Sequence, residues 1–149
     1  MSVRSDILGA LVTTIATVTG LTTAGQVVRG IPDLTALQTG PVAFVDCPLV
    51  SSTSDDQLGS FRRVMQIKII VATPAASGPT ARDTAIDALL DLVVEAIETD
   101  RTIGGRCVIL EFESLDILAG DEIAESLSMQ AIGALALRVE YISTSGTGF

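Results

Sequence analysis

Residues 61–73 read FRRVMQIKIIVAT, and residues 80–97 read TARDTAIDALLDLVVEAI. In the first stretch, apolar side chains alternate with Arg62, Gln66 and Lys68, and Arg63 is the one exception on the apolar side. Alternation with a period of two is typical of a strand that buries one face. The stretch therefore predicts a long, half-buried β-strand.

The second stretch has the pattern of an amphipathic helix. Thr80 and Asp83 form a T-x-x-D capping box, which marks a helix start. Six aliphatic residues follow at helical spacing: Ile86, Leu89, Leu90, Val93, Val94 and Ile97. Acids at every fourth position form a ridge beside this stripe, and Gly104 and Gly105 close the helical region. The sequence thus predicts a helix that packs on the strand.

Weaker patterns on either side complete the expected order of elements. We expect a helix over residues 5–18, a short strand over 26–31, a strand over 42–46 ending near Pro48, and a loop over 51–60. Strands are expected over 108–112, with a continuation over 115–118, and over 127–142, followed by a mobile tail at 143–149. This order predicts one α+β domain over residues 1–149, with two principal helices on one face of a mainly antiparallel or mixed sheet.

The net charge of −9 is concentrated in one part of the chain. Residues 82–125 contain twelve acids and three arginines, and the remaining charges cancel. Such a field repels phosphate, so nucleic-acid binding is disfavoured.

The apolar stretch 7–21 is short and interrupted, which favours a cytoplasmic protein over a membrane or exported one. Cys47 and Cys107 lack metal or redox spacing and read as buried thiols, although the sequence leaves a disulfide between them open.

The residue types for most catalysis are missing. The chain has no histidine, which excludes histidine-based triads, general bases and metal ligands. Glu111 and Glu113 are expected to share one strand face, and Asp121 and Glu122 fall in a turn. Such pairs serve glycosidases or hard metal ions, but solvated surface acids explain them better. We therefore expect no enzyme, no cofactor and no metal.

The second face of the predicted sheet favours assembly. Ile132, Ala134 and Ala136 make its centre small and apolar, where a solvated face would be polar. Either the first helix or the 51–60 loop covers this centre, or a neighbouring subunit does. Long strands also expose edges that need pairing or protection.

Four segments together resemble the tail terminator, or minor tail protein U-like, family of long-tailed phages. They are SDILGALVTTI at 5–15, SFRRVMQIKIIVAT at 60–73, TARDTAIDALLDLVVEAIETDRTIGG at 80–105 and ALALRVEYIS at 134–143. The resemblance implies a hexameric ring that caps the tail tube, stops its polymerisation and docks a neck or head-completion protein. It places the protein in the virion at the tail–neck junction, assembled in the host cytoplasm. DNA would pass through the ring without being bound.

Candidate interface residues follow from this reading. Asp55, Asp56 and Gln57 are expected to face a partner, and Arg62, Arg63 and Arg101 to form ion pairs between subunits. Other hypotheses remain open: a different neck or head-completion protein, a small cytoplasmic ligand-binding domain, or an enzyme that uses carboxylates.

Overall fold

The computed structural model describes residues 3–30, 40–52, 61–73, 79–118 and 131–143. Its elements are α1 (Val3–Ile15), β1 (Val27–Arg29), β2 (Val42–Ser52), β3 (Phe61–Thr73), α2 (Pro79–Thr99), β4 (Ile109–Leu118) and β5 (Ala131–Ser143). The strands form one sheet in the order β1-β2-β3-β5-β4, antiparallel throughout except for the parallel pair β1–β2. The α+β fold with a mixed sheet is as predicted.

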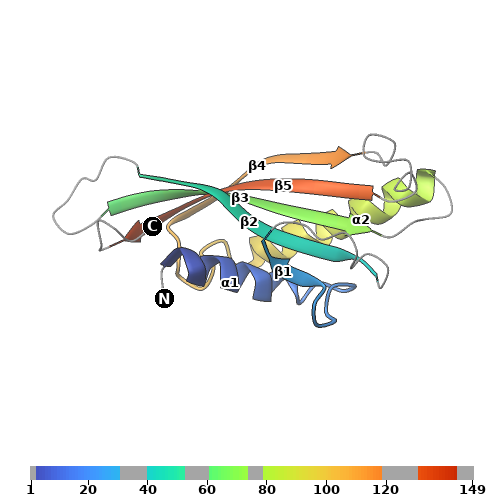
Figure 1. Cartoon of the computed structure of the whole chain (residues 1–149), viewed down its shortest axis with the longest axis horizontal. Coiled ribbons are helices and arrows are strands. Elements are labelled where there is room, and N and C mark those ends of the chain that lie inside the picture. The colour runs from blue at the N-terminus through green and yellow to red at the C-terminus, as the bar shows by residue number, and fades with distance from the viewer. Residues whose placement is uncertain (1–2, 31–39, 53–60, 74–78, 119–130, 144–149) are drawn as a thin grey trace.

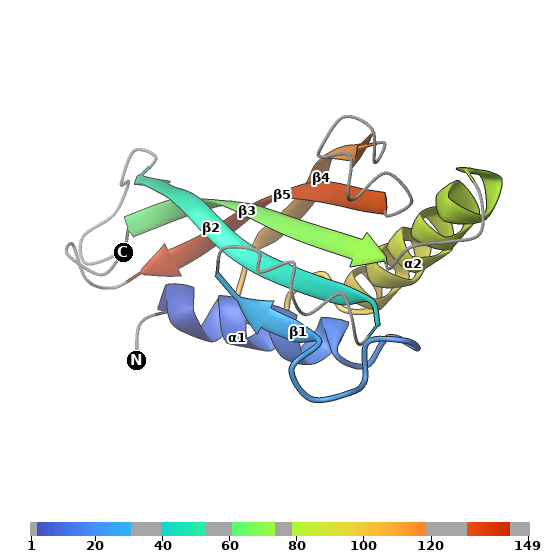
Figure 2. The same ribbon diagram turned by 45° about the vertical axis from the view of Figure 1, so that its right-hand side comes forward.

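Both helices lie on the same side of the sheet (Figures 1 and 2). α1 lies beneath β1 and β2, while α2 lies beneath the β3–β5 part. Buried residues of both helices belong to one core cluster with the strands. The predicted arrangement of two helices on one face is therefore confirmed, and the other face of the sheet is free of helices among the described residues.

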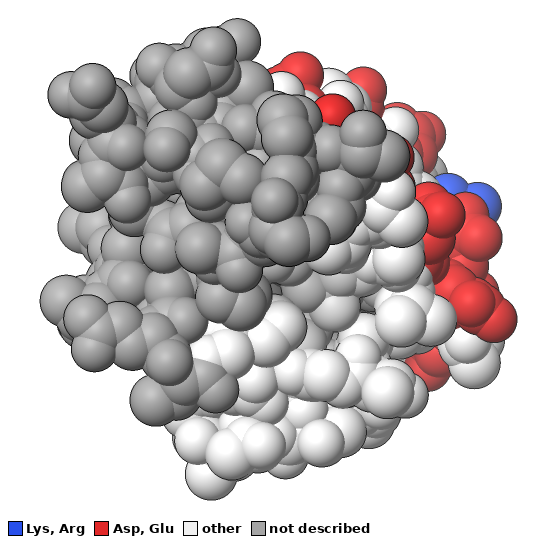
Figure 3. All heavy atoms as spheres, turned by 90° about the vertical axis from the view of Figure 1, so that its right-hand side faces the viewer, with Lys and Arg blue, Asp and Glu red and all other residues white. Residues whose placement is uncertain are grey.

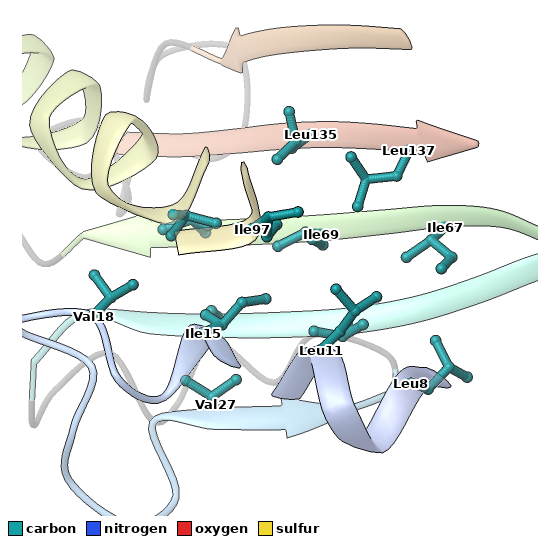
Figure 4. Packing of buried hydrophobic residues seen from close by; sticks show 14 of the residues in the cluster. Leu8, Leu11, Ile15, Val18, Val27, Ile67, Ile69, Ile97, Leu135 and Leu137 are labelled. Atoms are coloured by element: carbon teal, nitrogen blue, oxygen red, sulfur yellow. The ribbon is translucent and has the colours of Figure 1, made fainter. Parts of the chain in front are cut away.

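The core is built from aliphatic side chains of the predicted stripes. On β3, Met65, Ile67 and Ile69 are buried, and they pair across the sheet with Val139, Leu137 and Leu135 of β5. Figure 4 shows Leu11 and Ile15 of α1 and Ile97 of α2 packed against these strands. Burying one such side chain contributes about 1.5–3 kcal/mol, so the aliphatic stripes drive the packing of both helices.

α1 ends at Ile15, three residues before the predicted end. Beyond it the backbone bonds tighten to three-residue steps, from the Thr17 amide to the Thr14 carbonyl and from the Val18 amide to the Ile15 carbonyl. Thr14 and Thr17 also donate side-chain hydrogen bonds to carbonyls of the preceding turn. Threonine hydroxyls that compete for backbone groups weaken a helix, which explains the early end.

β2 continues to Ser52, whereas the sequence predicted an end near Pro48. The register shifts between Asp46 and Leu49, where β3 advances only from Lys68 to Gln66. The shift leaves one extra residue on β2, which is a bulge. Proline lacks a backbone donor but is accepted at a bulge, so the strand passes through it.

Two further boundaries differ from the predicted ones. α2 begins at Pro79, so Thr80 lies inside the helix and is not its cap. Proline suits the first turn of a helix because an amide there would have no hydrogen-bond acceptor within the helix. β5 includes Ser143, which is buried and paired with Phe61, so this residue does not belong to a tail. The predicted start of this strand at residue 127 lies outside the described residues. Residues 144–149 lie outside the described part.

Candidate assembly surface

β4 forms one edge of the sheet. It pairs with β5 on one side, and on its other side it meets no strand among the described residues. Leu115 and Ile117 are 44% and 43% exposed, and Ile109 is 36% exposed. An edge strand of ten residues with apolar side chains in solvent is a ready site for pairing with another chain.

A groove runs between this edge and α2. It has a volume of about 320 Å³. Its apolar floor comes from Val94 of α2, Phe112 and Leu115 of β4, and Leu135 of β5. Glu98 and Glu113 also line it, and both are exposed. The groove therefore combines an apolar floor with a negatively charged rim.

Further acidic side chains lie on the two elements that form the groove. We call the exposed acids of α2 and β4 the acidic flank. Figure 3 shows acidic side chains gathered along one side of this end of the molecule, with few basic atoms beside them. The acidic flank comprises Asp83, Asp87, Asp91, Glu95 and Glu98 of α2, and Glu111, Glu113 and Asp116 of β4. The sequence located this charge correctly, and the fold brings its two segments together.

The Asp100–Cys107 turn links α2 to β4. The Asp100 carboxylate accepts hydrogen bonds from the Thr102 hydroxyl at 2.6 Å and from the amides of Thr102 and Gly104 at 3.0 and 2.7 Å. These bonds, led by that of the Thr102 hydroxyl, lower the pKa of Asp100. The turn places Ile103 at a positive φ of 52°, which is strained for a β-branched residue. Asp100 thus holds a strained connection at the start of β4.

Arg101 extends from this turn onto β4. Its guanidinium donates to the Leu110 carbonyl at 2.9 Å and lies 5.8 Å from the centre of the Phe112 ring. Arg101 is exposed and was predicted to form an ion pair between subunits. The contacts seen here are within the chain, so that role stays a prediction.

The structure places Arg62 and Arg63 on opposite faces of β3. Arg62 is exposed and opposite Ile142, while Arg63 is buried, opposite Tyr141, with its guanidinium 5.2 Å from the centre of the Phe61 ring. The two arginines and Arg101 therefore do not form one site. Asp55, Asp56 and Gln57 lie outside the described residues, and their expected role stays untested.

The expected pairing of Glu111 with Glu113 on one strand face is wrong. The register of β4 shifts between Phe112 and Ser114, which makes Glu113 the extra residue of a bulge. Glu111 lies beside Arg138, 3.9 Å away, and Glu113 lines the groove with Glu98. The bulge therefore separates the two carboxylates that alternation alone would align. Asp121 and Glu122 lie outside the described residues.

The face of the sheet opposite the helices is a second surface, and it is exposed only in part, because Val42, Phe44 and Ala72 on it are buried. A hollow of about 270 Å³ on it is lined by Gln66, Lys68, Ala134 and Ala136, among others. Leu49 and Ile142 are 55% and 49% exposed near one end of this face. α1 packs on the other face, so the idea that it covers the apolar centre is wrong. Residues 53–60, the other proposed cover within the chain, lie outside the described part.

Both cysteines are free thiols. Cys107 is buried, and burial, reinforced by the charge of Asp100, raises its pKa to about 11. Cys47 is half-buried, and burial likewise raises its pKa. Neither thiol is activated for nucleophilic chemistry, because such cysteines need a lowered pKa.

Within the described ranges, no group of three or more Cys, Asp or Glu residues is arranged to hold a metal ion. In the same ranges, no helix combines the length and the apolar character needed to cross a bilayer.

The same fold occurs in a virion. A chain of the virion of a native gene transfer agent particle matches with a TM-score of 0.51 and 18% sequence identity, over 95% of this chain and 92% of that chain. The PVC sheath/tube terminator of an extracellular contractile injection system, in its extended state, gives a TM-score of 0.37 at 11% identity, over 91% of this chain and 55% of that one. The second value is too low to support an argument. No protein-family model matches the chain, and no curated protein matches its sequence.

Sequence reasoning missed the open edge and its groove. The segment EFESLDIL at 111–118 mixes acids with aliphatic residues, and charges of this kind are typical of an edge strand. That signal was present, but only the strand order shows that β4, and not β3 or β5, lies at the border.

Proposed function

We propose that this chain is a structural protein of a phage-type tail, and specifically a tail terminator. Its copies form a ring, and the proposal rests on the surfaces that are available for assembly. The observation that carries it is the β4 edge, which no other described strand pairs on its outer side and which exposes Leu115 and Ile117. The fold is shared with a virion chain over most of both lengths. An edge of this kind is stable in solution only when charges protect it or a partner pairs with it.

The proposed ring is a hexamer in which each copy contacts the next head to tail. A ring closes when the rotation between neighbouring copies is repeated a whole number of times. The face opposite the helices offers the contact surface, because Leu49, Ile142 and Lys68 are exposed on it. Arg62, Arg63 and Arg101 remain the proposed ion-pair residues between copies, and Asp55, Asp56 and Gln57 the proposed partner-facing residues.

The remaining parts of the proposal follow from that role. The whole chain acts as one domain without catalysis or a cofactor, in the virion at the junction of tail and neck, after assembly in the host cytoplasm. Its partners are the major tail tube protein and a neck or head-completion protein. DNA passes through the ring without being bound, which agrees with the acidic flank because like charges repel phosphate.

The test has two measurements on the purified full chain. Native mass spectrometry reports the number of copies, alone and with tail tubes, and electron microscopy reports the length of tubes polymerised with and without the chain. A ring of six copies, formed alone or on meeting tubes, together with shorter, capped tubes supports the proposal. A monomer that leaves tube length unchanged contradicts it, and binding of that monomer to a metabolite would favour the ligand-binding alternative.

A matched pair of variants connects the test to the edge. Leu115→Lys with Ile117→Lys places two charges on β4 and is expected to abolish capping. Leu92→Lys is the control, because Leu92 is 40% exposed on α2 and is not on the edge. If the edge variant and the control cap tubes equally well, the β4 edge is not needed for capping.

A further inference from the structure

We infer that the groove between α2 and β4 binds a cationic, extended segment of a different protein, which pairs with β4 as an additional strand. This inference rests on the proposed function and names the chemistry of one partner. Three observations carry it: the open edge of β4, the apolar floor of the groove, and the sign of the charge around it.

The main chain of β4 supplies the first requirement. A strand at a sheet border presents amide and carbonyl groups to an incoming extended chain, and these bonds give affinity with little sequence preference. The N-terminal part of β4 is partly occupied, because Arg101 donates to the Leu110 carbonyl. The part from Phe112 to Leu118 is the stretch left for a partner.

The groove floor supplies the second requirement. Phe112, Leu115 and Leu135 line a volume of about 320 Å³ together with Val94, which is enough for aliphatic side chains of a bound strand. Successive side chains of a strand point to opposite faces. A partner strand would thus place every second side chain on this floor and direct the others elsewhere.

The rim supplies the third requirement and selects the occupant. Glu98 and Glu113 line the groove, and further exposed acids lie along α2. Lysine or arginine side chains on the same face of the bound strand as its apolar ones would pair with these glutamates. Complementary charge of this kind favours the correct partner and speeds its association.

A second copy of this chain does not fit the groove. Pairing of two β4 edges would bring Glu111, Glu113 and Asp116 of both copies together, and like charges across strands are destabilising. The other border of the sheet is β1, which has three residues and a single cation, Arg29. The occupant is therefore a basic strand of another protein.

The test measures, by fluorescence anisotropy, binding of a fluorescent ten-residue lysine–valine peptide to the full-length protein. In this peptide valine and lysine take turns at every second position, with threonine between them, so that both kinds of side chain share one face. We expect saturable binding that weakens with added salt, since ion pairs at a surface are screened over about 10 Å at 0.1 M. A glutamate–valine peptide is expected not to bind. A lysine–valine peptide with all of its backbone amides methylated is expected to bind far less, because strand pairing needs those donors.

Variants locate the binding site. Glu98→Lys and Glu113→Lys are each expected to weaken binding about threefold, and the double variant about tenfold, as for exposed ion pairs. Asp6→Lys is the matched control, because it makes the same change of charge at an exposed position of α1 and should leave binding within about 1.5-fold. Thermal unfolding verifies that each variant is folded.

The outcomes separate this inference from the proposed function. Unchanged binding in the double variant, equal binding of the methylated peptide, or dimers that form through the groove would overturn the inference. If wild type and the double variant both cap tubes equally while no peptide binds, the groove inference fails and the proposed function stands. If the peptide binds as expected but the chain neither forms a ring nor caps tubes, the groove inference is supported and the proposed function as a tail terminator is refuted.

Discussion

Gly133 of β5 lies directly against Leu90 of α2. A Cβ atom on Gly133 would be 2.6 Å from Leu90 Cδ1, and Leu90 is only 1% exposed. The absence of a side chain at Gly133 therefore sets how closely α2 approaches the sheet. This contact fixes the position of the helix that forms one wall of the groove.

The first prediction concerns this contact. Gly133→Ala is expected to lower the free energy of unfolding by about 1–3 kcal/mol, the usual cost of overpacking a core. Chemical denaturation measures the loss. Gly9→Ala on α1 is the control, because nothing lies within 4 Å of the added Cβ, and it should leave stability unchanged or raise it by about 0.5–1 kcal/mol. Leu90→Ala should restore part of the loss in the Gly133→Ala background; strictly additive effects would contradict a direct contact.

The second prediction concerns Asp100 and pH. Its pKa is lower in the folded protein than in the unfolded chain, so its carboxylate stabilises the fold above the unfolded value of about 3.9. That contribution is lost as the pH falls through the folded pKa. Asp100→Asn should therefore lower Tm at pH 7, and the difference from wild type should shrink below pH 4. A difference that stays constant with pH would show that the charge of Asp100 does not support the turn.

The third prediction concerns Cys107. With a pKa of about 11, its thiolate fraction at pH 8 is about one in a thousand, against about a quarter for an ordinary thiol. Labelling of Cys107 in the Cys47→Ser variant should be slow at pH 8 and should accelerate up to about pH 11. The unfolded variant provides the control, since it should label at the rate of a free thiol. Fast labelling of the folded variant at pH 8 would contradict the buried position.

The fourth prediction separates two ion pairs of Arg138. Its guanidinium lies 3.2 Å from the Glu140 carboxylate, whose side chain is 8% exposed, and 3.9 Å from that of Glu111, which is 58% exposed. Arg138→Met should cost about 3 kcal/mol, because it leaves the Glu140 charge buried without its partner. Glu111→Gln should cost less than about 1 kcal/mol, as for surface pairs. If chemical denaturation shows equal losses of unfolding free energy for the two variants, the two ion pairs contribute equally to stability and the prediction is wrong.

Local patterns in the sequence predicted the principal elements. The predicted strand over residues 61–73 matches β3 in its bounds, although Val64 and Ala72 on its second face are also buried. The aliphatic stripe of α2 is buried as expected, with Val94 half-buried. Patterns of this kind succeed because the side-chain period of a strand or helix depends on the backbone alone. Boundaries were less accurate where threonines, a proline or a bulge altered the backbone, as at Ile15 and Pro48.

The candidate assembly surface could be predicted from sequence patterns only in part. The sequence by itself determined an α+β chain with aliphatic stripes, a concentrated negative charge and no histidine, because these follow from residue type and spacing. The tertiary structure alone decided that β4 is an edge, that Glu111 and Glu113 separate at a bulge, and that Glu98 and Glu113 meet at one groove. Strand order and register depend on contacts between residues far apart in the chain, and no local period encodes them.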